Sequence, residues 1–167
     1  MQLTIAFAEE RDAALLAALV TTAFEEYRTT LVPPSSAHRE TADSLRAVMA
    51  GAGGGALIAF DGAVPAGCVV FHDEDEDLYF GRLSVVPGAR GRGVARALIR
   101  AVEEYAAARG YPGTRLGVRL ALPANGALFA SLGYEVTGHG THEGFAEPTW
   151  ANMRKALASP RGGAPRV

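Results

Sequence analysis

The chain contains little cysteine, no excess of basic charge and no long apolar run, and each absence excludes a class of protein. A single cysteine, Cys68, rules out an internal disulfide and is typical of a reducing compartment, where we expect a buried and inert thiol. The net charge of −2 at pH 7 argues against recognition of nucleic acid or of a membrane surface by bulk electrostatics. The sequence has no run of about 18 apolar residues and does not begin with the pattern of a signal peptide. We therefore expect a cytoplasmic protein with no nucleic-acid or membrane partner.

Length and composition suit a single compact core. The chain has 167 residues, of which 49% are hydrophobic, and its composition marks no second domain. We expect one α/β domain over residues 1–157 and a flexible tail at 158–167, which is rich in proline and glycine. His139 and His142 are close in sequence, but no cluster of Cys, His or Asp stands near them, so we predict no metal site.

The most informative segment runs from Leu83 to Ile99 and reads LSVVPGARGRGVARALI. Its apolar start predicts a strand, its glycines predict a tight turn, and its later apolar spacing predicts an amphipathic helix. The N–H groups in the first turn of a helix lack an acceptor within the helix and lie at the positive end of its dipole, which favours an anion. The segment therefore predicts a site for a phosphorylated ligand, with Arg90 and Arg92 as phosphate contacts. Arg96 is either a further contact or part of a solvated basic face.

Two familiar phosphate-binding loops do not fit this segment. A P-loop requires Gly-Lys followed by Ser or Thr, and the segment has neither the lysine nor the hydroxyl. A dinucleotide fingerprint that begins at Gly91 would place the long side chain of Arg96 where Gly or Ala must let the helix approach the strand. An ordinary connection between a strand and a helix remains as the alternative.

The remaining pattern is Arg90, two residues, Gly93, one residue and Ala95, between an apolar strand and an amphipathic helix. It resembles the acetyl-CoA signature of the GNAT superfamily of N-acetyltransferases. The expected strands are 2–8, 56–60, 65–71, 78–86, 115–120, 134–137 and 149–157, and the expected helices are 9–27, 38–50, 92–109 and 125–132. This order is similar to the GNAT fold over nearly the whole chain. The resemblance implies a single α/β domain with a central mixed, mostly antiparallel sheet of about six to seven strands flanked by helices.

The resemblance also implies a reaction. Acetyl-CoA would lie between the strand at 83–86 and the strand at 115–120, and the N–H of Val85 would face the thioester carbonyl. A primary amine of a small molecule or peptide would attack that carbonyl directly in a ternary complex, without a metal. Asn125 would contact the cofactor or, alternatively, cap its own helix. The residues implied for acetyl-CoA binding are Leu83, Val85, Arg90, Gly91, Arg92, Gly93, Val94, Ala95, Arg96, Asn125 and Phe129.

Two positions depart from the family pattern. Phe129 stands where the family often has a tyrosine acid, and a phenyl ring has no proton to give. Tyr79 stands at the strand position where many members place a glutamate base, and a phenol with a pKa of about 10 is a poor base at neutral pH. The expected catalytic set is Val85, Tyr79 and His142, with His142 favoured as the base because an imidazole titrates near neutral pH. Other candidates for the base are Asp77, Glu26 and His139.

These departures keep a second class of function open. The chain would then be a non-catalytic acyl-CoA sensor or a structural subunit, which binds the ligand without turnover. Five consecutive acids at 73–77 predict a solvated turn, with attraction of a cationic amine as the alternative. Exposed edge strands would allow a homodimer, and Trp150 is expected in the core.

Overall fold

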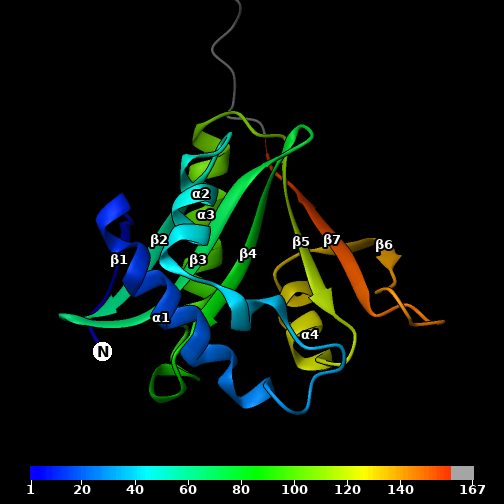
Figure 1. Ribbon diagram of the computed structural model, residues 1–167. Helices are drawn as coiled ribbons and strands as arrows, with labels where there is room; N and C mark the ends of the chain where they lie inside the picture. The colour runs from blue at the N-terminus through cyan, green and yellow to red at the C-terminus, as the bar shows by residue number, and fades with distance from the viewer. Residues whose placement is uncertain (159–167) are drawn as a thin grey trace, which may run out of the picture. The chain divides into compact units, whose positions relative to one another are not determined.

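The computed structural model describes residues 1–158, and Figure 1 shows their helices and strands. The strands are β1 (Leu3–Phe7), β2 (Gly55–Asp61), β3 (Val64–Glu74), β4 (Asp77–Val85), β5 (Gly113–Arg119), β6 (Glu135–Gly140) and β7 (Trp150–Ala156). The α-helices are α1 (Ala13–Phe24), α2 (Ala42–Ala50), α3 (Val94–Ala108) and α4 (Pro123–Ser131), and the short 3₁₀ helices are η1 (Glu10–Asp12), η2 (Glu25–Tyr27), η3 (Ser36–Arg39) and η4 (Pro87–Ala89). Every expected strand and helix is present. The expected tail lies outside the described residues, apart from Ala158.

The strands follow the order β1-β2-β3-β4-β5-β7-β6. The pairs β1–β2, β2–β3, β5–β7 and β6–β7 are antiparallel, whereas β4 and β5 are parallel at Leu78↔Thr114 and Tyr79↔Arg115. The parallel pair follows from the crossover through α3, because parallel neighbours require a long connection. The protein therefore has the mixed, mostly antiparallel α/β sheet that the family resemblance implies.

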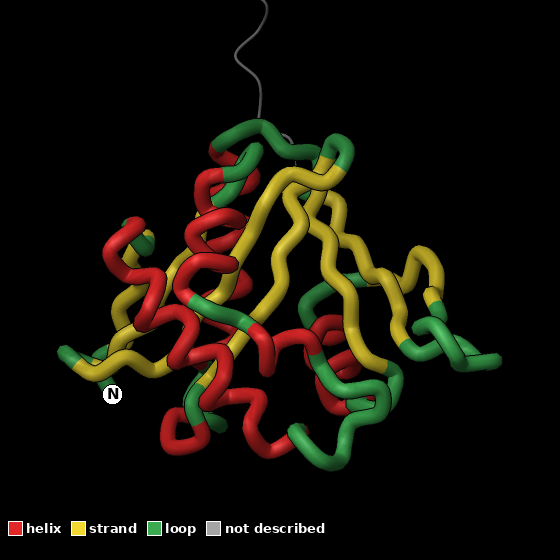
Figure 2. The backbone as a smooth tube through the Cα atoms, viewed as in Figure 1, coloured by secondary structure: helices red, strands yellow, loops and turns green. Residues whose placement is uncertain are grey.

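The described residues form two compact units, and both β4 and α3 contribute residues to each. The first unit contains residues 1–73 and 80–102, and the second contains Glu74–Tyr79 and the described residues from Glu103 onward. In the first unit, α1 and α2 lie on one face of the strands and the start of α3 lies on the other (Figures 1 and 2). In the second unit, α4 packs against β5. No helix within residues 1–158 has the length and apolar character needed to cross a membrane.

Both faces of β2 and β3 are buried in the first unit. On one face, Ile58 and Cys68 belong to an apolar cluster with residues of α1 and α2. On the other face, Leu57 and Val69 are equally buried, which explains why these strands read as continuous apolar runs. Burial raises the pKa of the Cys68 thiol to about 12. The thiol is therefore protonated at neutral pH and inert, as expected.

The predicted helix over 38–50 is divided at Glu40, which is extended between η3 and α2. Thr41 begins α2 with a capping box. Its hydroxyl accepts from the N–H of Ser44 at 3.1 Å, and the Ser44 hydroxyl accepts from the N–H of Thr41 at 2.9 Å. These bonds place the N-cap of α2 one residue after Glu40 and leave Glu40 outside both helices.

The five acids at 73–77 do not share one environment. Asp75 is exposed, and its backbone adopts the left-handed conformation with a φ of 54°. Asp77, at the start of β4, is only 1% exposed. Arg154 donates to both carboxylate oxygens of Asp77 at 2.7 and 2.9 Å, and Arg115 donates at 2.5 Å. Arg154, followed by Arg115, holds the pKa of Asp77 below its ordinary value. The prediction of a solvated run is therefore wrong for Asp77, and its fully engaged carboxylate does not suit a general base.

Candidate functional site

A glycine-rich loop joins β4 to α3 in the first unit. Its ends are anchored by Ala89 and Val94, which are 7% and 2% exposed. Between these anchors, Gly91 and Gly93 have φ angles of 73° and 82°. A Cβ at either glycine would meet nothing within 4 Å, so space is available, but the left-handed backbone would be strained by any other residue. The loop therefore exposes main chain in a conformation that glycine alone adopts readily.

Helix α3 begins directly after this loop. The N–H of Ala97 donates to the carbonyl of Gly93 at 3.0 Å, which makes this the first bond of the helix. The N–H groups of Val94, Ala95 and Arg96 consequently have no acceptor within the helix. They lie at the positive end of the helix dipole, beside bare glycine main chain. This is the combination by which helix N-termini hold phosphate groups.

A close approach of β3 supports the strand before the loop. A Cβ on Gly67 would lie 2.4 Å from the carbonyl oxygen of Ser84 and 3.2 Å from Cγ1 of Val94. Because Gly67 has no side chain, β3 can lie close to both β4 and the first residue of α3 at this point. The N–H of Val86 donates to the carbonyl of Ala66 at 3.0 Å and fixes the end of β4.

The side chain of Arg90, a predicted phosphate contact, has partners within the protein. Its guanidinium donates to the carbonyls of Ala23 at 3.0 Å and Val85 at 3.3 Å, and it also pairs with the carboxylate of Glu26. The last carbonyls of a helix attract a cation because they form the negative end of its dipole, and Ala23 lies in the last turn of α1. The side chain of Arg90 therefore connects the loop to α1. Glu26, a candidate base, has its carboxylate in the ion pair with Arg90.

Arg92 has a looser environment. Its side chain is 54% exposed, and its nearest carboxylate oxygen, on Asp61, is 3.7 Å from the guanidinium, which is too far for a hydrogen bond. Arg96 is also exposed at the start of α3. Arg92 can move toward an anion at modest cost, as a mobile charge on a ligand-binding loop must.

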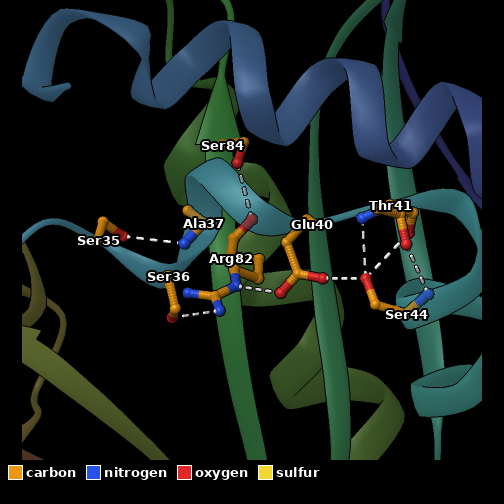
Figure 3. A network of polar contacts seen from close by, with 8 residues as sticks. All are labelled: Ser35, Ser36, Ala37, Glu40, Thr41, Ser44, Arg82 and Ser84. Carbon is orange, nitrogen blue, oxygen red and sulfur yellow. Dashed lines mark hydrogen bonds and ion pairs between the residues drawn. The ribbon is translucent and has the colours of Figure 1, made fainter.

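A polar network that sequence reasoning missed surrounds Arg82 in the middle of β4 (Figure 3). Arg82 is left-handed, with a φ of 52°, which typically costs a non-glycine residue about 1–3 kcal/mol. Its guanidinium donates to Glu40 at 2.8 Å and to Ser36 at 2.7 Å. The sequence signal is an arginine in the middle of a strand, but its partners are 42 and 46 residues away along the chain and no local pattern connects them.

Phe129 lies in the second unit and is 7% exposed. It packs edge-to-face on Tyr134, with ring centroids 6.0 Å apart. The Tyr134 hydroxyl donates to Glu103 at 3.0 Å and bonds to Thr114 at 2.7 Å, and burial raises the pKa of this phenol well above its ordinary value. Neither ring is therefore suited to give a proton to a leaving group.

Asn125 is exposed in the first turn of α4 and does not cap the helix. The cap residue is Leu122, followed by Pro123, and no side chain caps this end. The alternative role of Asn125 as a cap is therefore wrong. Tyr79 is half-buried on β4, and its hydroxyl lies 3.5 Å from the position a Cβ would take on Gly117.

His142 is half-buried and lies between β6 and β7, where three side chains surround its ring. Trp150 and Phe145 both meet it edge-on, with centroids at 4.8 and 6.5 Å, and its Nδ1 bonds to the Thr149 hydroxyl. Burial, with a smaller effect of Arg119, lowers the pKa of His142. Trp150 is half-buried and packs on His142, so it differs from the expected core residue. His139 is exposed on β6.

A family model described as Acetyltransferase (GNAT) family matches residues 16–134, which include the glycine-rich loop, α3 and α4. The chain belongs to this family. Among residues 1–158, no group of three or more His, Cys, Asp or Glu side chains is arranged to hold a metal ion.

Solved structures of GNAT proteins share the fold of this chain. The PaiA N-acetyltransferase from Thermoplasma acidophilum, in complex with coenzyme A, has a TM-score of 0.77 and 15% identity over 94% of this chain and 100% of that chain. A structure from Salmonella typhimurium with its cofactor acetyl-CoA has a TM-score of 0.69 and 20% identity over 100% and 99%. A curated human relative, N-acetylaspartate synthetase, is 37% identical over 71 residues, which are 42% of this chain and 24% of that protein. The match thus spans about a quarter of the human protein.

The predicted site residues of this family member fall into two sets. The first unit brings together Leu83, Val85, Arg90, Gly91, Arg92, Gly93, Val94, Ala95 and Arg96. The second unit holds Tyr79, Asn125, Phe129 and His142. The first set surrounds the glycine-rich loop and the start of α3, and the second set contains an imidazole, His142, and a phenol, Tyr79.

Proposed function

We propose that this protein transfers the acetyl group of acetyl-CoA to a primary amine of a small molecule or peptide, by direct attack in a ternary complex. The observation that carries the proposal is the loop from Arg90 to Ala95, with two left-handed glycines in front of α3, in a chain of the GNAT family. The N–H groups in the first turn of α3 have no acceptor within the helix and suit the pyrophosphate of coenzyme A, with Arg92 and Arg96 as supporting charges.

The end of β4 supplies the group that would act on the thioester. Bound acetyl-CoA provides an activated acyl carbon and a thiolate leaving group. The main-chain N–H of Val85 donates to the thioester oxygen as negative charge develops there, and one such preorganised donor is worth about 3 kcal/mol of barrier. Val85 is half-buried, and its carbonyl is fixed by Arg90, so this strand end is held in place before a ligand arrives.

His142 is the proposed general base. The attacking amine must be neutral, and a base must take its proton. With its pKa lowered by burial, the imidazole is neutral at pH 7 and able to accept. The edge-on contacts of Trp150 and Phe145 and the bond to Thr149 hold the ring in one orientation. Asp77 and Glu26 are less suitable, because arginines engage their carboxylates.

The leaving group departs without a protein acid in this proposal. Phe129 has no proton, and the Tyr134 hydroxyl is committed to Glu103 and Thr114. A thiol has an ordinary pKa of about 8.5, so coenzyme A is a tolerable leaving group that solvent can protonate afterwards. The same observation favours a second candidate function, an acyl-CoA sensor that binds without turnover.

Ligand-dependent unfolding followed by a turnover assay tests the proposal. Acetyl-CoA, NAD and ATP are compared in parallel, and saturating acetyl-CoA should raise the melting temperature by about 5–10 °C. Release of free thiol is then measured against polyamines, peptide amines and amino acids. L-aspartate belongs to this panel because the human relative is an N-acetylaspartate synthetase. A shift without thiol release supports the sensor, and the absence of a shift with acetyl-CoA contradicts both functions.

A further inference from the structure

The left-handed residue inside β4 needs a physical explanation. Among residues 1–158, the non-glycine residues with positive φ are Asp75 and Arg82. Asp75 lies in the turn between β3 and β4, where this conformation is ordinary. Arg82 lies within β4, three residues before Val85, where a regular strand would be extended. An irregularity at this position decides the direction of the strand end that follows it.

The side chain of Arg82 is anchored to a segment far away in sequence. Its Nε is 2.8 Å from Oε1 of Glu40, and its Nη2 is 2.7 Å from the hydroxyl of Ser36. The two side chains of the ion pair are 29% and 14% exposed, so water screens their interaction only in part. In Figure 3 the guanidinium points away from β4 toward Glu40 and Ser36.

The anchor is itself rigidly held. The second carboxylate oxygen of Glu40 accepts from the Ser44 hydroxyl at 2.5 Å, and Ser44 is part of the capping box that starts α2. Each oxygen of Glu40 therefore has its own donor, one on β4 and one on α2 (Figure 3). A carboxylate fixed in this way can hold an arginine in a strained backbone conformation more firmly than a flexible surface acid can.

The main chain beyond Arg82 is pinned at both ends. The hydroxyl of Ser84, which is 2% exposed, donates to the carbonyl of Arg82 at 2.9 Å. The N–H of Val86 donates to the carbonyl of Ala66 at 3.0 Å. Between these two bonds lie Leu83 and Val85, so the orientation of their peptide groups depends on the conformation of Arg82.

We propose that Arg82 is a positioning residue, which Glu40 and Ser36 hold in its left-handed conformation so that the N–H of Val85 points in its working direction. This inference rests on the proposed function, in which that N–H donates to the thioester oxygen. Loss of the network lets β4 relax toward an extended strand and turns the donor away. Binding of the coenzyme A phosphates should change little, because the loop after Val85 is also anchored by the buried Ala89 and Val94 and by the bond from Arg90 to Ala23.

The test uses Arg82→Ala, Arg82→Gly and Glu40→Gln in the full chain, with Arg46→Ala as the matched control. Arg46 forms an exposed pair with Asp43 at 2.7 Å on α2, the helix that follows Glu40. Amide hydrogen exchange of residues 83–86 is measured without ligand, and exchange should quicken about tenfold in Arg82→Ala and Glu40→Gln. Arg82→Gly should be less affected than Arg82→Ala, because glycine adopts a positive φ without strain.

Kinetics complete the experiment. Arg82→Ala and Glu40→Gln should lower kcat by about tenfold to a hundredfold, since a small misplacement of a reacting group has effects of that size. The KM for acetyl-CoA should stay within about twofold, and Arg46→Ala should match the wild type in every readout. An unchanged kcat and unchanged exchange in a folded Arg82→Ala or Glu40→Gln variant overturns the proposal. If wild type binds no acetyl-CoA or releases no thiol, the proposed function fails, whereas exchange still decides whether Arg82 holds β4.

Discussion

Asp77 in the second unit and Arg92 in the first unit use their charges in opposite ways. Asp77 is 1% exposed, and two arginines donate to its carboxylate. Arg92 is 54% exposed, and its nearest acid is too distant for a hydrogen bond. A carboxylate that the fold buries must be matched by protein donors, since it has lost water. A cation that is to meet a ligand stays solvated until the ligand arrives. The comparison separates charges that hold the fold from charges left for binding.

The largest expected effect comes from removing the buried charge. Asp77→Asn should lower the free energy of unfolding by about 3 kcal/mol, because two arginines lose their anion. The value lies at the low end for buried pairs, since the arginine side chains are about a third exposed and remain partly solvated. Urea denaturation measures the loss, and acetyl-CoA affinity should change by less than about twofold.

Asp75→Asn is the matched control. Asp75 is 77% exposed and 3.2 Å from Arg115, and asparagine also tolerates its left-handed backbone. This variant should lose less than about 1 kcal/mol. Because the pKa of Asp77 is lowered in the folded state, its contribution is complete above the unfolded pKa of about 3.9 and is lost as pH falls through the folded pKa. The difference between wild type and Asp77→Asn should therefore shrink below about pH 4. Equal losses for Asp75 and Asp77 would contradict the comparison.

The sequence predicted the order of elements well because each has a local signal. Apolar alternation marks the strands, and the turn between β2 and β3 carries Gly62, with its φ of 60°. The glycine-rich loop was also predictable, since its chemistry lies in the main chain and glycine spacing records main-chain conformation. The family match over residues 16–134 confirms the resemblance on which that prediction rested.

Side-chain partnerships were not predictable in the same way. Nothing local distinguishes Asp77 from the four acids before it, because its partners Arg115 and Arg154 are 38 and 77 residues away. Arg90 was expected on phosphate, but the carbonyl of Ala23, 67 residues earlier, takes one of its donors. The ion pair between Glu40 and Arg82 was missed for the same reason, because its partners are 42 residues apart in sequence. The role of a charged side chain depends on partners that are distant in sequence, and a single sequence does not show which residues form these pairs.

His142 shares features of both Asp77 and Arg92. Its ring is held by neighbouring side chains, as Asp77 is, but the ring can still gain a proton. His142→Gln should lower kcat by about a hundredfold at pH 7.5 if the imidazole is the base. Its pKa lies below the ordinary 6.5, so the wild-type rate should be flat at neutral pH and fall as acid protonates the ring. The acid limb of the pH profile should disappear in the variant. Thiol release at a series of pH values measures both effects.

His139→Gln is the control for that experiment, because His139 is exposed on β6 only three residues away. It should retain the wild-type rate and profile. A His142→Gln enzyme that keeps both its rate and its acid limb places the base elsewhere. Loss of rate in both variants instead indicates a general disturbance of the segment between β6 and β7.

Gly93→Ala tests whether binding rests on main chain. Alanine at a φ of 82° is strained, and relaxation of the loop should weaken acetyl-CoA binding by about tenfold. Gly88→Ala is the control, because a Cβ at that glycine also meets nothing within 4 Å and its φ is not in the left-handed region. Isothermal titration should show near wild-type affinity for Gly88→Ala. Equal weakening in both variants would show that loop conformation is not the deciding factor.

The smallest effect is expected from Arg92 itself. An exposed, mobile arginine gives a phosphate less than about 1 kcal/mol, because water and salt screen the pair, so Arg92→Ala should weaken acetyl-CoA binding by about threefold. Arg92→Glu should weaken it further, since repulsion is added, and both differences should diminish at high salt. Titrations at two salt concentrations measure this, with Arg46→Ala as the control for an arginine away from the loop. If Arg92→Ala weakens binding more than Gly93→Ala does, affinity rests on the side chain. The loop would then be a scaffold for its arginines rather than the site that holds the phosphates.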